Sequence, residues 1–209
     1  DAVLEFSQNK VNQFNRYIGR IKGIMRANDL HGKADELQKL REPPHDVTYI
    51  THKQLGDLVA HIQQTGSNRI AKVSKETFLA LIEFLFWSGL RIGESAATNA
   101  SYADEDAGVL RVDWQIDDRG KKRLPKYDKR RKTHIPRHGF ASFKKWITAK
   151  DRGQLDRQQA TKILKKFCKE IFLDPINHIS LHGLRHSYAH LMLRHFDGPN
   201  GKRFSLDDV

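Results

Sequence analysis

The sequence predicts a mainly α-helical fold with a small antiparallel β-sheet, an α+β class. Two observations predict it. After Thr51, most segments repeat apolar residues at helical spacing, and one stretch, residues 108–117, alternates apolar and polar residues as a half-buried strand does. The chain has 209 residues, of which 38% are hydrophobic. That length suffices for one sizeable core and a small additional module.

The N-terminal region predicts one amphipathic helix over residues 10–28. Its apolar face is formed by Val11, Phe14, Ile18, Ile21 and Met25. A polar stretch follows over residues 31–47, and its two successive prolines, Pro43 and Pro44, disfavour helix. We therefore expect a domain boundary there, with one part over residues 1–46 and a larger part over residues 47–209.

Regular helical spacing begins after Thr51. A helix is predicted over residues 53–64, and a second begins after Ser74, a residue type that caps helix N-termini well. Gly89 is expected to end this second helix, because glycine tolerates the left-handed conformation found after helix C-termini. Arg91 then lies in the following turn, and Glu94 lies in a short next helix.

The alternating stretch predicts a strand over residues 108–117. Its apolar side is formed by Leu110, Val112, Trp114 and Ile116. Turn-forming residues follow at 117–120, and residues 121–136 are crowded with Lys and Arg, which suggests a basic β-hairpin. Further helices are expected over residues 140–149 and 158–172 and from about Leu181.

The charge balance points to a polyanionic partner. Lys and Arg total 37 against 25 Asp and Glu, a formal net charge of +12, so nucleic acid is the first candidate. The single Cys168 cannot form an intrachain disulfide and is expected to be buried, which fits a reducing intracellular compartment. The most apolar stretch, residues 78–87, is short and contains Glu83, so neither a signal peptide nor a membrane span is predicted.

Two short motifs and one basic segment stand apart from generic helix. The motifs are Ser-Gly-Leu-Arg-Ile-Gly-Glu at residues 88–94 and His-Gly-Leu-Arg-His-Ser-Tyr-Ala at residues 182–189; the segment is Leu-Pro-Lys-Tyr-Asp-Lys-Arg-Arg-Lys-Thr-His-Ile-Pro at residues 124–136. Their residue types and order resemble the catalytic boxes and lysine-bearing β-hairpin of the tyrosine recombinases of the phage-integrase type. With the N-terminal helix, which is similar to the end of a core-binding domain, the resemblance covers nearly the whole chain.

The resemblance implies roles for particular residues. Arg91 and Arg185 would hold the scissile DNA phosphate with His182, and Lys126 would protonate the departing 5′ oxygen, with Lys129 left open as an alternative. Glu94 and His186 would orient these groups. The remaining hairpin cations would bind DNA: Lys121, Lys122, Arg123, Lys129, Arg130, Arg131 and Lys132.

Elementary chemistry agrees with these roles. A guanidinium stays charged at any working pH and offers forked donors to phosphate. His182 and Arg185 are three residues apart, which places them on one face of a helix. Two arginines can neutralise the charge that develops on the phosphate oxygens, so no metal is expected. The resemblance further implies that no nucleotide cofactor is used, because the covalent protein–DNA link keeps the energy of the broken bond.

The resemblance also implies the overall activity. The expected function is site-specific recombination of double-stranded DNA through a 3′-phosphotyrosyl intermediate, by a homo-oligomer, a tetramer on paired sites when full length. The protein would act in the bacterial cytoplasm, as a nucleoid-associated or phage-encoded enzyme. Tyr188 is interpreted as a packing residue, so the nucleophilic tyrosine is expected beyond Val209, and the chain as given is expected to be unable to cleave DNA.

Three alternatives remain open at this point. A non-catalytic DNA-binding relative and an enzyme like the type IB topoisomerases would show the same motifs. The third is a metal site, because His178, His182, His186 and His190 recur every four residues. The metal site is disfavoured, since position 183 is Gly and the protease motif of two histidines needs a glutamate there.

Overall fold

The computed structural model describes residues 2–38, 48–125, 129–174 and 176–195. The chain divides into two compact units, Asp1–Asp46 and Val47–Val209, and each is described by itself. The predicted linker prolines and Lys126 lie outside the described residues. Among the helices that the structure describes, none has the length and apolar character needed to cross a lipid bilayer.

The first unit contains two helices, α1 (Ala2–Ala27) and α2 (His31–Glu36). The helix predicted over residues 10–28 therefore exists and begins earlier than expected. Residues 31–36, expected to be part of a polar linker, form α2 instead. This helix packs on α1: Ala34 is fully buried, and Arg26 of α1 pairs with Asp35 of α2 at 2.6 Å.

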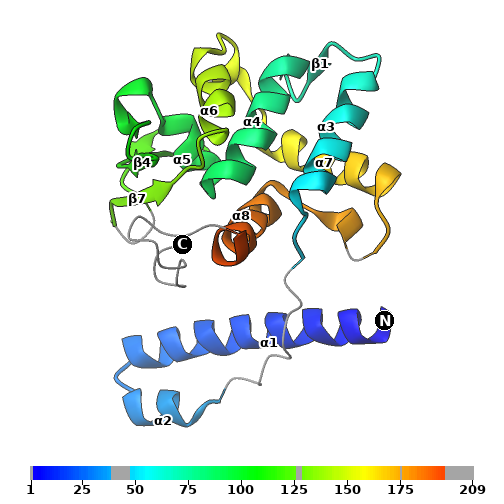
Figure 1. Ribbon diagram of the computed structural model, residues 1–209. Helices are drawn as coiled ribbons and strands as arrows, with labels where there is room; N and C mark the ends of the chain where they lie inside the picture. The colour runs from blue at the N-terminus through cyan, green and yellow to red at the C-terminus, as the bar shows by residue number, and fades with distance from the viewer. Residues whose placement is uncertain (1, 39–47, 126–128, 175, 196–209) are drawn as a thin grey trace. The chain divides into compact units, whose positions relative to one another are not determined.

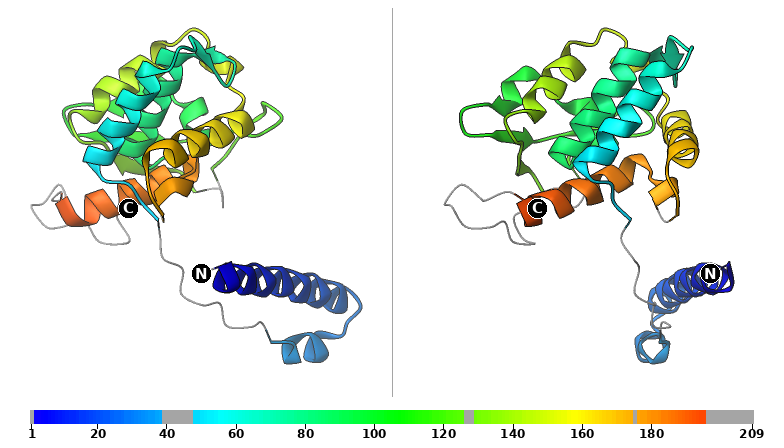
Figure 2. Two further views of the ribbon diagram at one scale, coloured as in Figure 1. Left: turned by 90° about the vertical axis from the view of Figure 1, so that its right-hand side faces the viewer. Right: turned by 45° about the vertical axis from the view of Figure 1, so that its right-hand side comes forward.

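The second unit is built around α4, a helix buried on nearly all sides. Its helices are α3 (His52–Gln64), α4 (Lys75–Ser88), α5 (Ile92–Ala97), α6 (Gly139–Thr148), α7 (Arg157–Ile171) and α8 (Leu181–His195). Helix α4 packs against α3, α6 and α8, and Figures 1 and 2 show α8 crossing near the C-terminal end of α4. A helix apolar all round belongs in a core, so α4 is the rigid element from which the Arg91 turn emerges.

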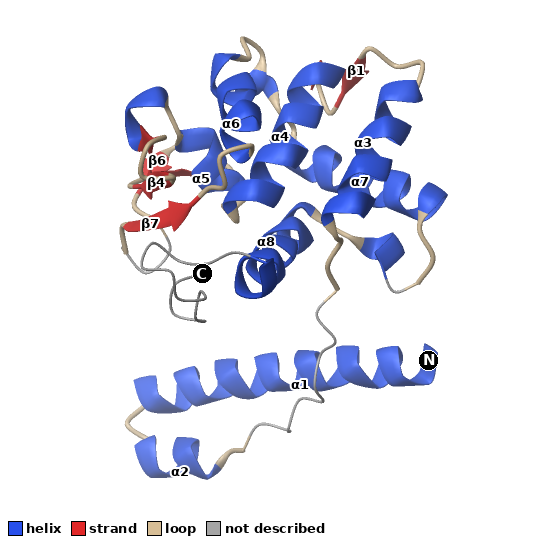
Figure 3. Ribbon diagram, in the orientation of Figure 1, coloured by secondary structure: helices blue, strands red, loops and turns tan. Residues whose placement is uncertain are grey.

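In the residues of this unit that the structure describes, the strands form three small antiparallel sheets (Figure 3). Their strands are β1 (Arg69–Ile70) with β2 (Val73–Ser74); β3 (Ala103–Asp104), β4 (Val109–Val112) and β7 (Arg131–His134); and β5 (Gln115–Ile116) with β6 (Lys122–Arg123). The prediction of a single strand over residues 108–117 was wrong in one respect. It divides after Val112, because β4 pairs with β3 and β7 whereas β5 pairs with β6.

Capping residues fix both ends of α4 as the sequence predicts. The Ser74 side chain accepts a hydrogen bond from the backbone N–H of Thr77, which satisfies one of the free donors at the helix start. Gly89 follows the helix with φ of 61°, in the left-handed region, and its N–H bonds the carbonyl of Leu85 at 3.0 Å. The chain can therefore turn sharply toward Arg91.

We expect substitution of Gly89 by alanine to destabilise the fold by about 2–3 kcal/mol. The left-handed backbone disfavours any side chain, and an added methyl group would lie 2.2 Å from Cδ1 of Tyr188. Gly120→Ala is the matched control, because Gly120 also has positive φ, 75°, but open space around its Cβ position. Urea unfolding should show a loss of about 1 kcal/mol for the control. Equal losses in the two variants would mean that Tyr188 moves aside freely.

Candidate functional site

Arg91 is held by Glu94 at the start of α5. The Arg91 backbone N–H donates to Oε2 of Glu94 at 2.8 Å, and its Nη1 donates to Oε1 at 2.9 Å. Glu94 is completely buried, whereas a third of the Arg91 side chain is exposed. Glu94 therefore holds the Arg91 guanidinium on its buried side, and the opposite side of the guanidinium is open to solvent.

Strand β7 brings a second arginine to the same carboxylate. Thr133 anchors the strand by donating to the carbonyl of Ser88, the last residue of α4, at 2.8 Å. Arg131 lies two residues earlier, so its side chain leaves the strand on the same face as Thr133. Both of its terminal nitrogens donate to Glu94, at 2.8 and 2.7 Å, a bidentate pair.

Helix α8 contributes the third arginine. Nη1 of Arg185 donates to the carbonyl of Gly89, two residues before Arg91 in the turn after α4. Burial lowers the pKa of the Arg185 guanidinium from its ordinary value, and the neighbouring positive charges of Arg131 and Arg91 lower it further. Two motifs about ninety residues apart in the sequence thus meet at one place.

Arg91, Arg131 and Arg185, gathered around Glu94, form what we call the arginine cluster. Burial alone would raise the pKa of the Glu94 carboxyl, but the hydrogen bonds from Arg131 and from the Arg91 backbone hold it below its ordinary value. Glu94 is therefore ionised at neutral pH. Glu94 is bonded to Arg91 and Arg131, and Arg185 lies near enough to feel its charge. One carboxylate thus serves three guanidiniums, so the cluster carries two uncompensated positive charges, and a phosphate group would balance them.

The position of Arg131 beside Glu94 was not predicted from the sequence. Arg131 was expected to bind DNA with the other hairpin cations, and this role stays a prediction; the structure adds that its guanidinium is bonded to Glu94. A signal was present in the sequence: in the alternating pattern of a strand, Arg131 shares a face with Thr133, which is buried, while Lys132 points away and is exposed.

His182 and His186 lie together on α8. Both are exposed, and their rings form an edge-to-face pair with centroids 5.0 Å apart. His182 precedes Arg185 by three residues, so the two side chains leave neighbouring positions on the helix surface. The predicted general acid, Lys126, lies outside the described residues.

The other cations that the structure describes in the basic segment are exposed, and three of them lie on strands. Lys122 and Arg123 form β6, and Arg123 pairs with Asp117 at 2.7 Å. Lys132 lies on β7. The exposed members are Lys121, Lys122, Arg123, Lys129, Arg130 and Lys132. They remain available to a polyanion, as the charge pattern predicts.

Tyr188 is buried, with 2% of its surface exposed. Its hydroxyl donates to the carbonyl of His134 at 2.7 Å and lies 3.2 Å from the Thr133 hydroxyl. Burial raises the pKa of this phenol. These contacts agree with a packing role, in which Tyr188 ties α8 to β7 behind the arginine cluster.

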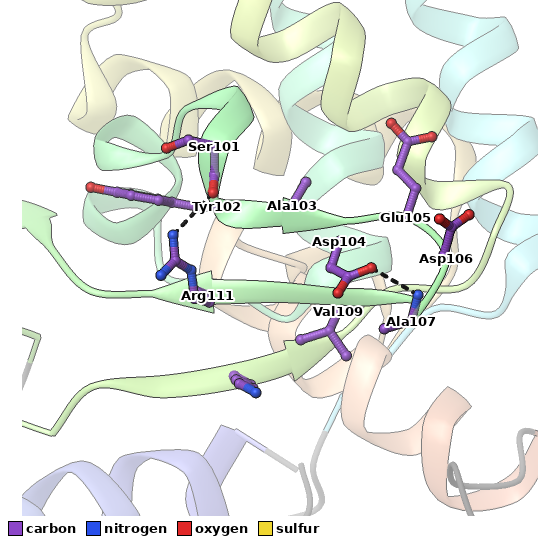
Figure 4. A pocket seen from close by; sticks show the side chains of 10 residues that line it. Ser101, Tyr102, Ala103, Asp104, Glu105, Asp106, Ala107, Val109 and Arg111 are labelled. Carbon is purple, nitrogen blue, oxygen red and sulfur yellow. Dashed lines mark hydrogen bonds between the residues drawn. The ribbon is translucent and has the colours of Figure 1, made fainter.

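A hollow of about 490 Å³ lies beside the turn between β3 and β4. In contrast to the arginine cluster, its lining is rich in acidic residues. Figure 4 shows its acidic residues, Asp104, Glu105 and Asp106, with Arg111 donating to the carbonyl of Ser101 at 3.0 Å. The carboxylates would repel a DNA backbone, so this hollow is a poor candidate for phosphate binding.

The histidine repeat does not lie along one helix. His178 belongs to a 3₁₀ turn, Ile176–His178, that precedes α8. In the part of the chain that the structure describes, no group of three or more His, Cys, Asp or Glu side chains is arranged to hold a metal ion. Cys168 is buried, and burial raises its thiol pKa to about 12.

Known proteins match this chain in sequence. The model of the phage integrase family matches residues 48–197. The tyrosine recombinase XerC of Corynebacterium glutamicum is 28% identical, over 78% of this chain and 52% of the relative. The chain therefore spans about half the length of the curated relative it matches.

Solved structures match the fold. The Tn1549 transposon integrase in complex with transposon right end DNA aligns with a TM-score of 0.63 at 14% identity and covers 93% of this chain and 74% of that chain. The same integrase in complex with a circular intermediate DNA gives 0.61 at 16% identity, with the same coverage. This likeness confirms the predicted fold class, a mainly helical domain with small antiparallel sheets. Because the family model covers more than half of the residues, including both arginine motifs, the chain belongs to the phage integrase family.

Proposed function

We propose that this protein is a site-specific DNA recombinase that cleaves and rejoins DNA strands through a 3′-phosphotyrosyl intermediate. One observation carries the proposal: Arg91 and Arg185, from distant motifs, meet in a cluster with two uncompensated positive charges. Preorganised donors of this kind stabilise the charge that develops on a phosphate during strand cleavage. The DNA complexes of the Tn1549 integrase support double-stranded DNA as the partner.

The proposed division of labour follows from the chemistry of each side chain. Arg91 and Arg185 would each donate to the non-bridging oxygens of the scissile phosphate, with Glu94 and Arg131 holding Arg91 in place. His182, exposed on α8, would contribute a further donor. Lys126 would protonate the departing 5′ oxygen as general acid. His186, whose ring packs against His182, would orient it.

The proposal places the nucleophilic tyrosine beyond Val209, where the family resemblance puts it. Tyr188 is unsuited, since its hydroxyl is buried and hydrogen-bonded to His134.

We further propose an organisation for the chain. Residues 1–46 would form the end of a core-binding domain and its linker, and residues 47–209 would form the catalytic domain. The full-length protein would assemble as a tetramer on paired sites.

Covalent trapping tests the function. Full-length protein is mixed with duplex fragments of its source genome that carry random nicks, so that cleavage near a nick releases a short strand and prevents religation. We expect a protein–DNA adduct with the peptide on a 3′ phosphate, recovered repeatedly at one sequence. An adduct at scattered sequences, with relaxation of supercoiled plasmid, would indicate a topoisomerase-like enzyme. Salt-sensitive DNA binding without any adduct would indicate a non-catalytic relative.

A further inference from the structure

The β5–β6 hairpin carries two exposed cations, Lys122 and Arg123, and is braced from within. Strand β5 pairs with β6, so that Ile116 lies opposite Lys122. Asp117, at the start of the turn, accepts two backbone hydrogen bonds from within the turn, both at 2.9 Å, and pairs with Arg123 at 2.7 Å. Nζ of Lys122 lies 4.5 Å from the ring centroid of Trp114, within the range of cation–π attraction. The position of β5 therefore decides where both cations lie.

Strand β5 approaches α5 closely at Gly93, the residue before Glu94. A Cβ atom added at Gly93 would lie 2.7 Å from the carbonyl oxygen of Ile116 and 3.7 Å from Cβ of Gln115. The first distance is too short for a real Cβ atom, so glycine is required for the strand to lie this close to the helix. The hairpin is thereby docked on the same short helix whose Glu94 organises the arginine cluster.

Arg157, the first residue of α7, binds the same carbonyl. Its Nη1 donates to the carbonyl of Ile116 at 2.7 Å and lies 3.6 Å from the position of a Cβ atom at Gly93. Only 20% of the Arg157 side chain is exposed, whereas its acidic neighbour Asp118, 3.6 Å away, is 94% exposed. An exposed ion pair contributes little, and a hydrogen bond from a charged donor contributes more. The bond to the carbonyl is therefore the contact by which Arg157 holds β5.

The hairpin is loosely packed near this bond. A hollow of about 440 Å³ lies between the hairpin turn and the start of α7, and Arg157 is among the residues that line it. Atoms that face a hollow make few van der Waals contacts across it. The hydrogen bond of Arg157 therefore supplies attraction that apolar packing does not supply at this place.

We propose that Arg157 is a positioning residue for DNA binding, which acts by holding the β5–β6 hairpin against α5. The inference rests on the proposed function, in which Lys122 and Arg123 contact the DNA backbone. A cation that is already held in place binds a phosphate without first losing conformational freedom. With Arg157 present, the hairpin cations and the arginine cluster meet one duplex together. Without it, the hairpin leaves α5 and its two phosphate contacts are lost.

The test measures binding of full-length Arg157→Met to a fluorescent random-sequence DNA duplex between about 0.05 and 0.2 M salt. Methionine keeps an apolar side chain but cannot donate a hydrogen bond. Each phosphate contact contributes a slope of about −0.9 to log affinity against log salt. Loss of two contacts should make the slope shallower by about 1.8 and lower the affinity about 30-fold at about 0.15 M salt. Arg157→Lys, which keeps a charged donor, should retain most of the affinity.

Cleavage separates a defect in DNA binding from damage to the arginine cluster. The substrate is the duplex recovered by covalent trapping, at saturating concentration. Single-turnover cleavage by Arg157→Met should stay within about threefold of the wild-type rate, because the contacts of Arg91 and Arg131 with Glu94 remain. A loss confined to affinity is the signature of a group that binds DNA equally before and during cleavage.

Gly93→Ala disturbs the same contact from α5. Its methyl group would displace the carbonyl of Ile116, so the salt slope should again become shallower, and adding Arg157→Met should change it little further. Gly56→Ala is the matched control, because Gly56 of α3 has nothing within 4 Å of its Cβ position, and its slope should equal that of wild type. If urea unfolding shows that Arg157→Met does not fold, the slope of Gly93→Ala decides the question.

Arg152→Met controls for general destabilisation. Arg152 is also half-buried, and its Nη1 donates to the carbonyl of Thr98 at 3.2 Å, at the C-terminal end of α5 rather than on the hairpin. Burial lowers the pKa of both guanidiniums, that of Arg152 and that of Arg157. Arg152→Met should therefore lose stability as Arg157→Met does, while its salt slope stays that of wild type.

Removal of the hairpin cations themselves completes the test. The double variant Lys122→Gln with Arg123→Gln should show the same shallower slope, and Arg157→Met should have no further effect in that background.

The outcomes separate this inference from the proposed function. A wild-type salt slope in Arg157→Met and Gly93→Ala, or an effect of Arg157→Met that persists after both cations are removed, overturns the positioning role and leaves the recombinase function standing. If the slopes change as expected but wild-type protein forms no covalent adduct, the recombinase function fails and the positioning role in DNA binding stands. If wild-type protein does not bind DNA, both fail.

Discussion

Replacing Arg185 by alanine in the full-length protein should lower single-turnover DNA cleavage by about 100- to 1,000-fold, the effect of removing one preorganised donor from an anionic transition state. Its guanidinium is half-buried and fixed by the Gly89 carbonyl, so no reorganisation is needed when a phosphate arrives. Arg91→Ala should cause a loss of similar size. The double variant should lose less than the product of the two, because both groups act on one phosphate.

Arg152→Ala provides the matched control. Arg152 is also half-buried, and its Nη1 donates to a backbone carbonyl, that of Thr98, at 3.2 Å, but it lies outside the arginine cluster. Burial lowers the pKa of its guanidinium as it lowers that of Arg185. If cleavage by Arg152→Ala falls as far as that by Arg185→Ala, the losses reflect general destabilisation rather than phosphate binding.

Glu94→Gln should destabilise the fold by about 3–5 kcal/mol near pH 7, since it leaves two guanidiniums without their buried counter-charge. The folded-state pKa of Glu94 lies below its ordinary value of 4.5. Its contribution to stability is therefore fully present above about pH 4.5 and is lost as the pH falls through the folded-state pKa. Urea unfolding between about pH 7 and pH 3 should show the gap between wild type and Glu94→Gln narrowing with acid.

The control for this series is Glu105→Gln. Glu105 pairs with Lys144 at 2.8 Å, but both side chains are about half exposed, so the change should cost at most about 1 kcal/mol. A gap between wild type and Glu94→Gln that stays constant down to low pH would contradict a depressed pKa at Glu94.

The sequence predicted those features that local chemistry decides. The cap at Ser74 and the left-handed Gly89 depend on residues near one another in the chain, and both appear in the structure, at the two ends of α4. The family and the fold class, predicted from the two motifs and the basic segment, are confirmed. The roles of Lys126, His182 and the DNA-binding cations stay predictions.

Features that depend on pairing between distant segments were harder to predict. Alternation alone could not show that the strand divides after Val112, since the division follows from its two different partners. Nor could it show that Arg131 binds Glu94, which requires β7 to dock on the end of α4. The contact of Trp114 with Lys122 has the same origin: an indole between β4 and β5, expected on an apolar face, meets a cation from β6.

We propose that Arg91 and Arg185 together neutralise the charge of a single DNA phosphate. It is tested most directly by cleavage rates of wild type and Arg185→Ala on two duplexes, one natural and one with an uncharged methylphosphonate at the scissile position. The claim predicts that the large loss on the natural duplex nearly disappears on the uncharged one. An equal loss on both duplexes would contradict it.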